Sequence, residues 1–228
     1  SLTVYDLNAD IAKADLAALN IDHRGRSEVS FITSGNYTVA RSGSKEGQLC
    51  ITGLNLTNDG KSYDFDDINL TTKQYEKEHD FLLMAPFAEA SYSGDASLKQ
   101  FINDLKNLTV KKEIPALFSD STYVRSNNAY KADLVFHNTM DILAFALPGM
   151  YIEEGTSIHA QIDEDGEFHA DINSGRIAYG AEYLKGLSAV FNNQNENLNG
   201  EMHCEAIQIR SIKLNDNKLQ VFSKNNQI

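Results

Sequence analysis

The chain has 228 residues, of which 42% are hydrophobic and 23% charged, an ordinary composition for a folded protein with a sizeable core. Its formal net charge of −12 opposes binding to nucleic acid and electrostatic adsorption to an anionic bilayer. No apolar run approaches the roughly 20 residues that span a bilayer. We therefore expect no nucleic-acid partner, and we expect any contact with lipid to be hydrophobic.

Three segments have the composition or spacing of helices. Residues 11–19 are rich in Ala and Leu, which predicts a helix near the start of the chain. Apolar residues at i, i+3, i+4 and i+7 predict an amphipathic helix over residues 98–108, with Ser97 as its N-cap. Residues 139–147 predict a third short helix, which begins after Asn138 and ends at Pro148.

Elsewhere apolar and polar residues alternate, which predicts strands joined by turns. In the first half, the strand-like segments are 29–31, 37–39, 49–51, 63–65 and 68–70, with a hairpin turn at 58–60. In the second half, they are 177–183, 187–191, 202–206, 212–214 and 219–221, with turns at 192–200 and 215–217. The chain is therefore predicted to be mainly β, an antiparallel meander with a few short helices.

The clearest local structure is a hairpin over residues 157–172. A two-residue Asp-Gly turn would pair Ile162 with His169 and would mix apolar and polar side chains on each face. A three-residue loop at 164–166, with Gly166 in the left-handed region, instead pairs Ile162 with Phe168. We expect this bulged turn because it keeps six apolar residues on one face: Ile158, Ala160, Ile162, Phe168, Ala170 and Ile172.

Candidate catalytic and metal-binding residues are few. His159 and His169 fall on the polar face of this hairpin, close enough to share a metal ion with Asp171 or Gln161. Solvated polar positions on a strand are the favoured interpretation. Residues 76–80 combine Glu, His and Asp, but no complementary catalytic element is visible, so a charged turn is favoured there. We expect no enzyme activity, no metal and no cofactor.

The two cysteines and one Ser- and Asn-rich segment bear on the organisation of the chain. Cys50 and Cys204 lie inside apolar strand-like segments, which favours small core residues over a single disulfide. Residues 114–128 are the best candidate for a long connection. They divide a β-rich segment over 1–118 from a β-meander over 119–228, unless the two form one continuous sheet.

The order of the segments resembles the repetitive β region of TamB/AsmA-like envelope proteins, in particular those of Bacteroidetes-type bacteria. The resemblance rests on residues 7–20, 47–70, 90–108 and 154–180. It implies an extended, curved, groove- or taco-like sheet with an apolar interior, in the periplasm or cell envelope. It also implies a parent protein anchored in the inner membrane through parts that this chain lacks.

The function that this resemblance implies is non-enzymatic. Such a β scaffold aids lipid transport or outer-membrane protein assembly, so its partners would be acyl chains or outer-membrane assembly proteins. The residues expected to line the groove are Ile158, Ala160, Ile162, Phe168, Ala170, Ile172, Ile177 and Tyr179. In the alternative, a structural or adhesive β-sandwich, the same residues form a closed core. A glycan hydrolase with paired carboxylates is a third possibility, for which no convincing pair is visible.

Overall fold

A computed structural model describes residues 2–22, 25, 27–108, 126–193 and 197–223, and most of these lie in β-strands. The first eight strands are β1 Leu2–Asp15, β2 Ser27–Ala40, β3 Lys45–Asn58, β4 Lys61–Phe65, β5 Ile68–Tyr75, β6 Glu78–Ala85, β7 Ala88–Gly94 and β8 Tyr130–Phe136. The remaining six are β9 Met150–Ile152, β10 Ser157–Ile162, β11 Phe168–Tyr179, β12 Glu182–Asn192, β13 Asn199–Ile209 and β14 Ile212–Phe222. The described residues also form two helices, α1 Leu98–Lys106 and α2 Met140–Ala146.

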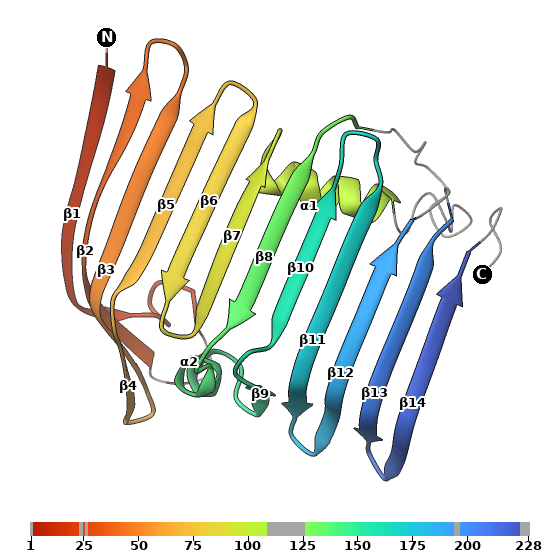
Figure 1. Ribbon diagram of the computed structural model, residues 1–228. Helices are drawn as coiled ribbons and strands as arrows, with labels where there is room; N and C mark the ends of the chain where they lie inside the picture. The colour runs from red at the N-terminus through yellow and green to blue at the C-terminus, as the bar shows by residue number, and fades with distance from the viewer. Residues whose placement is uncertain (1, 23–24, 26, 109–125, 194–196, 224–228) are drawn as a thin grey trace.

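All fourteen strands belong to one antiparallel sheet that runs from β1 at one edge to β14 at the other (Figure 1). Strand β4 pairs with β3 and β9 pairs with β11, beside the main path of the meander. The predicted fold class, a mainly β antiparallel meander in an open, curved sheet with few helices, is confirmed. The predicted boundary near residue 118 lies outside the described residues, but β7 and β8 on either side of it pair directly.

The strand register separates an apolar face from a polar one. Side chains directly opposite one another in paired strands lie on the same face, so the register can be followed from strand to strand. One such line, which we call the apolar row, crosses twelve strands through Leu7, Gly35, Leu49, Leu70, Leu83, Ala90, Leu134, Ile158, Ile172, Ala189, Met202 and Leu219. The neighbouring residues make a second line on the opposite face, through Asp6, Asn36, Gln48, Thr71, Leu82, Ser91, Asp133, His159, Asp171, Val190, Glu201 and Gln220.

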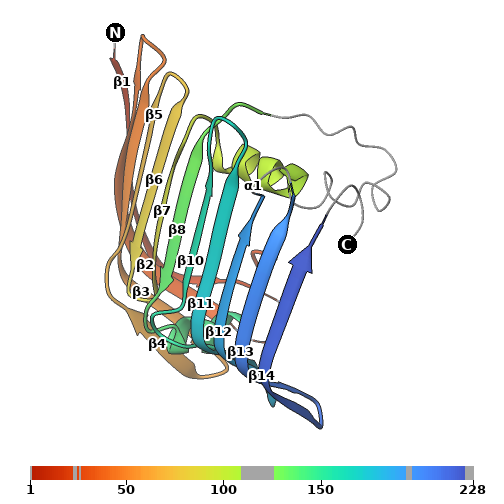
Figure 2. The same cartoon turned by 45° about the vertical axis from the view of Figure 1, so that its right-hand side comes forward.

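Helix α1 covers one end of the apolar face (Figure 2). Ser97 caps the helix, because its Oγ accepts a hydrogen bond from the Gln100 backbone N–H at 3.3 Å. Phe101 of α1 is buried and packs in a cluster whose other buried members are Tyr92, Leu108, Tyr130, Ala160, Ile162 and Phe168. The predicted amphipathic helix and its cap are therefore confirmed.

Helix α2 lies at the opposite ends of the strands and packs on the same face. Phe145 of α2 contacts Leu16 and Leu56, and Val29 packs against this cluster. Val29 and Gly35 are six residues apart in the regular strand β2, so both point to the apolar face. Register shifts in β1 and β3 bend these strands around the cluster (Figure 1).

Some of the local sequence predictions are confirmed and others are wrong. Ile162 pairs with Phe168, and Gly166 has a φ of 74° in the bulged loop between β10 and β11. The helix predicted over residues 11–19 is instead strand β1 followed by a turn, in which the Asp15 carboxylate accepts hydrogen bonds from the backbone N–H groups of Ala17 and Ala18. The turn predicted at 215–217 lies inside β14, and the chain reverses earlier, at Arg210.

The cysteines and the helices can be placed directly. Cys50 and Cys204 are both free thiols. Cys204 is fully buried, as expected of a small core residue, whereas Cys50 is half-buried on the polar face, where it pairs with Ser34 and Asn69. Neither helix among the described residues is long and apolar enough to cross a bilayer.

Candidate functional site

The apolar row forms the floor of an open trough. Its residues are half-buried in the middle of the sheet, with Ala189 fully buried, and Leu7 and Leu219 at the two edges are 51% and 52% exposed. Helix α1 lies toward one end of the strands and α2 toward the other (Figure 1). The trough is therefore an apolar surface that runs across the strands and has a helix on each side.

The end under α1 is closed by aromatic packing. The Phe101 ring centroid lies 5.9 Å from that of Tyr92 and 5.4 Å from that of Tyr130. Tyr92, Tyr130 and Phe168 are only 3–5% exposed. Contacts of this kind contribute packing energy beyond simple area burial. This part of the face is a conventional hydrophobic core.

A buried polar network fixes α1 above this core. Asp104, which is 4% exposed, accepts hydrogen bonds from the Tyr130 hydroxyl at 2.6 Å, from Ser126 Oγ at 2.6 Å and from Gln100 Nε2 at 2.8 Å. Burial raises the pKa of Tyr92 to about 12, and the carboxylates of Asp95 and Asp104 add to the effect. Burial and the hydrogen bond to Asp104 also raise the pKa of Tyr130 above its usual range. Both phenols therefore stay neutral donors at physiological pH.

Two glycines allow neighbouring groups to pack closely near the β1 end of the trough. A Cβ atom on Gly35 would lie 2.5 Å from the Gln48 carbonyl oxygen, and one on Gly47 would lie 2.7 Å from the Tyr37 ring. A cavity of about 410 Å³ lies beside these two glycines. Its apolar-face lining comes from Tyr5, Leu7, Tyr37, Leu49 and Leu70. A volume of this size is typical of small-molecule sites.

The structure separates the predicted groove residues into three groups. Ile158 and Ile172 lie opposite each other in the apolar row and are half-buried. The next group lies under α1, where Ala160, Ile162 and Phe168 are 3–7% exposed and Ala170 packs against them. These four therefore belong to a core at the edge of the trough, because α1 covers them.

The prediction that Ile177 and Tyr179 line the same groove is wrong. Strand β11 has an unbroken register, so its side chains alternate strictly between the two faces. Ile172 lies on the apolar face, and Ile177, an odd number of residues later, lies on the other. Tyr179 shares the face of Ile177 and is 63% exposed.

The sequence-based prediction missed most of the trough floor, including every member of the row in the first half of the chain. Leu49, Leu70 and Leu83 pair in succession across β3, β5 and β6, and Leu134 continues the line after Ala90. Each of these leucines lies in a short apolar segment of the sequence. Their common face is determined by the register between strands. Alternation within one strand does not indicate which residues of different strands lie opposite one another.

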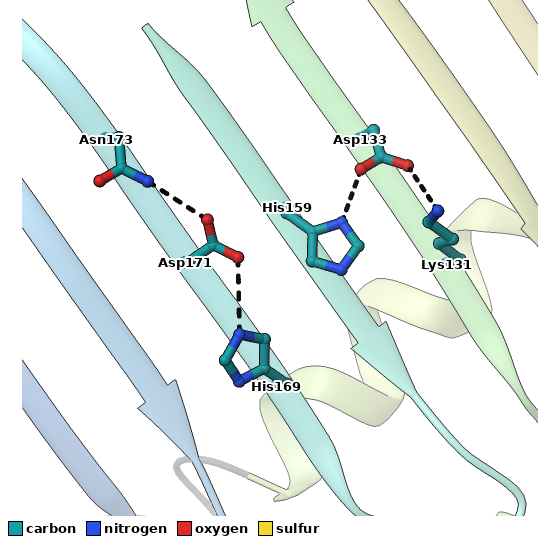
Figure 3. Close-up of polar contacts among 6 residues, drawn as sticks. All are labelled: Lys131, Asp133, His159, His169, Asp171 and Asn173. Atoms are coloured by element: carbon teal, nitrogen blue, oxygen red, sulfur yellow. Dashed lines mark hydrogen bonds and ion pairs between the residues drawn. The ribbon is translucent and has the colours of Figure 1, made fainter.

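The opposite face holds His159 and His169 (Figure 3). His159 Nδ1 lies 2.6 Å from Asp133 Oδ1, and His169 Nε2 lies 3.6 Å from Asp171 Oδ2. The two rings are 6.4 Å apart, and each faces its own aspartate rather than a shared point. Within the described residues, no three His, Cys, Asp or Glu side chains are arranged to hold a metal ion.

A hollow of about 770 Å³ opens at the end of the strands near the β10–β11 turn. It is lined mainly by polar groups, among them five carboxylates, Glu78, Asp80, Asp95, Asp163 and Glu167, together with Lys131 and His169. The lining of this hollow is therefore net negative, like the chain as a whole. Its residues lie at the outer rim of the sheet, apart from the apolar row, so it does not contribute to the trough.

Comparisons of this chain with protein-family models, with curated proteins and with solved structures found no significant match. The resemblance to TamB/AsmA-like proteins therefore stays a prediction. The function has to be argued from the trough itself.

Proposed function

We propose that the chain is a non-enzymatic β scaffold that holds acyl chains, or comparably apolar cargo, along the apolar row. The observation that carries the proposal is the continuity of this row, in which apolar residues and one glycine follow one another across twelve strands, and all but the buried Ala189 stay partly open to solvent. Exposed contiguous apolar surfaces of this extent are uncommon in soluble proteins and usually mark an interaction site. From the predicted resemblance to envelope proteins, we also propose that this role is carried out in the periplasm, within a longer membrane-anchored protein.

The dimensions of the trough suit several acyl chains. Neighbouring strands lie about 4.8 Å apart, so the row is roughly 50 Å long from β1 to β14. An acyl chain in one leaflet reaches about 15 Å, half of a hydrocarbon core of about 30 Å. The trough is therefore long enough for about three chains in line, which suits a surface along which lipid moves rather than a single-ligand pocket.

Hydrophobic contact supplies the binding energy. Each methylene removed from water contributes about 0.8 kcal/mol, so a chain that buries about ten methylenes gains roughly 8 kcal/mol before association costs. We expect dissociation constants in the micromolar range or weaker. The net charge of −12 repels an anionic headgroup and salt screens this repulsion, so the affinity should not fall as the ionic strength rises.

Two adjacent leucines of β6 provide a matched test. Leu83 belongs to the apolar row and Leu82 points to the opposite face, and both side chains are half-buried. Leu83→Asp places a charge on the trough floor and should weaken binding of a fluorescent fatty acid about tenfold, because a desolvated carboxylate costs more than 1 kcal/mol. Leu82→Asp should leave the binding unchanged.

Circular dichroism spectra of both variants establish that each remains folded. The proposal fails if the wild-type chain binds no acyl chain. It also fails if Leu82→Asp and Leu83→Asp weaken the binding equally, since the ligand would then not distinguish the two faces.

A further inference from the structure

The cavity of about 410 Å³ on the apolar face lies where β1, β2, β3 and β5 run side by side (Figure 1). Two lines of paired residues cross these strands there. The first belongs to the apolar row and the second lies two residues along each strand, so both are on the apolar face. The first line contains Leu7, Gly35, Leu49 and Leu70, and the second contains Tyr5, Tyr37, Gly47 and Thr72. We call the cavity lined by these eight residues the recess.

Two tyrosine rings lie in the recess. Tyr5 and Tyr37 are paired across β1 and β2, and both line the cavity. The Tyr37 ring lies against the backbone of Gly47, where a Cβ atom would be 2.7 Å from it. Aromatic rings offer flat apolar faces against which another ring can stack. The recess therefore presents flat contacts in addition to the leucine side chains of the row.

The shape of the recess differs from that of a single hydrocarbon chain. Four neighbouring strands span about 14 Å, and two residues along a strand add about 7 Å. For a volume of about 410 Å³, these dimensions leave a depth of about 4 Å. Nonbonded carbon atoms meet at about 4 Å, so one extended chain fills only about half of the width. A planar ring system fills both the width and the depth.

The charges around the recess favour an uncharged ligand. Among the described residues that line it, none is Lys, Arg or His, and the single carboxylate is that of Asp6, which belongs to the opposite face. A phosphate or carboxylate group would therefore meet no cation. The phenols of Tyr5 and Tyr37 are 59% and 38% exposed, and neither is hydrogen-bonded within the described part of the chain. They can donate hydrogen bonds to an oxygen of a neutral ligand.

We propose that the recess binds the planar ring of an uncharged lipid, of the sterol or prenylated-quinone class. Both classes combine a flat ring system, an oxygen that accepts a hydrogen bond and no net charge. The hydrocarbon tail continues along the apolar row, past Leu70 to Leu83 on β6. A rigid ring loses less conformational freedom on binding than a flexible chain does, which favours it in this part of the trough. The inference rests on the proposed function, because it names the kind of cargo that the trough holds.

Neighbouring threonines of β5 provide a matched pair of variants. Thr72 lies in the recess and Thr71 on the opposite face, and both are half-buried. Thr72→Trp fills the recess and should weaken binding of a fluorescent polyene sterol about tenfold, because the side chain takes the place of the ligand ring. The affinity for a fluorescent fatty acid should change less than about twofold, since the rest of the row is untouched. Thr71→Trp should change neither affinity.

An unlabelled prenylated quinone, added as a competitor, separates the two classes of ring lipid. Displacement of the sterol shows that the recess takes quinones as well, and either ligand supports the proposal. Melting temperatures of both tryptophan variants establish that each is folded.

A second variant tests the phenols without filling the recess. Tyr5→Phe combined with Tyr37→Phe keeps both rings and removes both hydroxyls. It should weaken binding of the sterol about fivefold, the effect of one lost hydrogen bond, and leave the fatty acid within about twofold. This variant tests the proposal even if Thr72→Trp fails to fold.

The proposal is overturned if the wild-type chain binds neither the sterol nor the quinone, or if Thr72→Trp and Thr71→Trp weaken sterol binding equally. An unchanged sterol affinity in the double phenylalanine variant would also overturn it. The effect of Leu83→Asp on fatty-acid binding tests the proposed function separately. A chain that binds fatty acid in the trough but no ring lipid would refute this inference and leave the proposed function standing.

Discussion

The covered and uncovered parts of the apolar face use the same strands but differ in what lies above them. Under α1, Ile162 and Phe168 are each 3% exposed and form a conventional core. A few residues along the same strands, Ile158 and Ile172 belong to the row between the helices and are only half-buried. The alternation pattern is identical in the two regions. Whether an apolar residue becomes core or binding surface is therefore decided here by the extent of α1 and not by the strand.

The strongest test of this comparison is one aspartate substitution under α1 and one in the uncovered part of the apolar row. Phe168→Asp removes a buried ring, which costs about 3–5 kcal/mol, and adds an unpaired buried charge that costs several more. Since whole domains are stable by about 5–15 kcal/mol, this variant should unfold. Ile158→Asp should remain folded, with a loss of roughly 1–2 kcal/mol in urea denaturation. Equal losses at both positions would mean that the row is a core as well.

A second comparison concerns the cover itself. Phe101 is 5% exposed beneath α1, whereas its neighbour Ile102 is 56% exposed on the outer side. Phe101→Ala should lower the free energy of unfolding by about 3 kcal/mol or more. Ile102→Ala should change it by no more than about 0.5 kcal/mol. A similar small effect for both would show that α1 does not hold the sheet.

The phenols under α1 make the covered end sensitive to alkali. Tyr92 has a folded pKa of about 12, above the unfolded value of 10.0, so the fold favours the protonated phenol. Its contribution to stability is complete below pH 10 and is lost as the pH rises from 10 toward 12, at about 1.4 kcal/mol per pKa unit. Tyr92→Phe keeps the ring and should flatten the decline in melting temperature above pH 10. An unchanged alkaline profile would argue against a buried phenol.

A smaller effect is expected at the turn that leads into this covered end. Gly166 has a φ of 74°, and Asn193 holds the turn by donating to the Gly166 carbonyl and accepting from the Phe168 backbone N–H. Gly166→Val should cost about 1 kcal/mol or more, because a β-branched residue resists the left-handed region. Gly166→Asn should cost less. Melting temperatures that are the same for both variants would contradict the turn geometry.

Local patterns in the sequence predicted the features that depend on residues close together in the chain. The spacing around Phe101 predicted α1, and the apolar phase around Gly166 predicted the bulged hairpin. The helix predicted over residues 11–19 was wrong because a propensity for helix is weaker than the pairing of Leu7, Ala9 and Ile11 in a long strand. Leu16 directly follows the end of β1 and is buried against Leu56 and Phe145.

The features of the trough that depend on tertiary contacts could not be predicted from local sequence patterns. The position of α1 above Phe168 rather than above Ile158 depends on a tertiary contact that no local spacing encodes. Ile172 and Ile177 are an odd number of residues apart, so they cannot share a face in a regular strand such as β11. The row through Leu49, Leu70 and Leu83 required the register of three strands at once.

The most direct measurement is a crosslink map with a photoactivatable fatty acid, read by mass spectrometry of the digested chain. Bound on the trough floor, the probe should label residues of the apolar row, with Leu70, Leu83, Leu134 and Ile158 near its centre. Leu82 and Val190, which are apolar side chains on the opposite face, should remain unlabelled. Labelling that is absent, or equal on the two faces, would contradict an apolar trough that holds acyl chains.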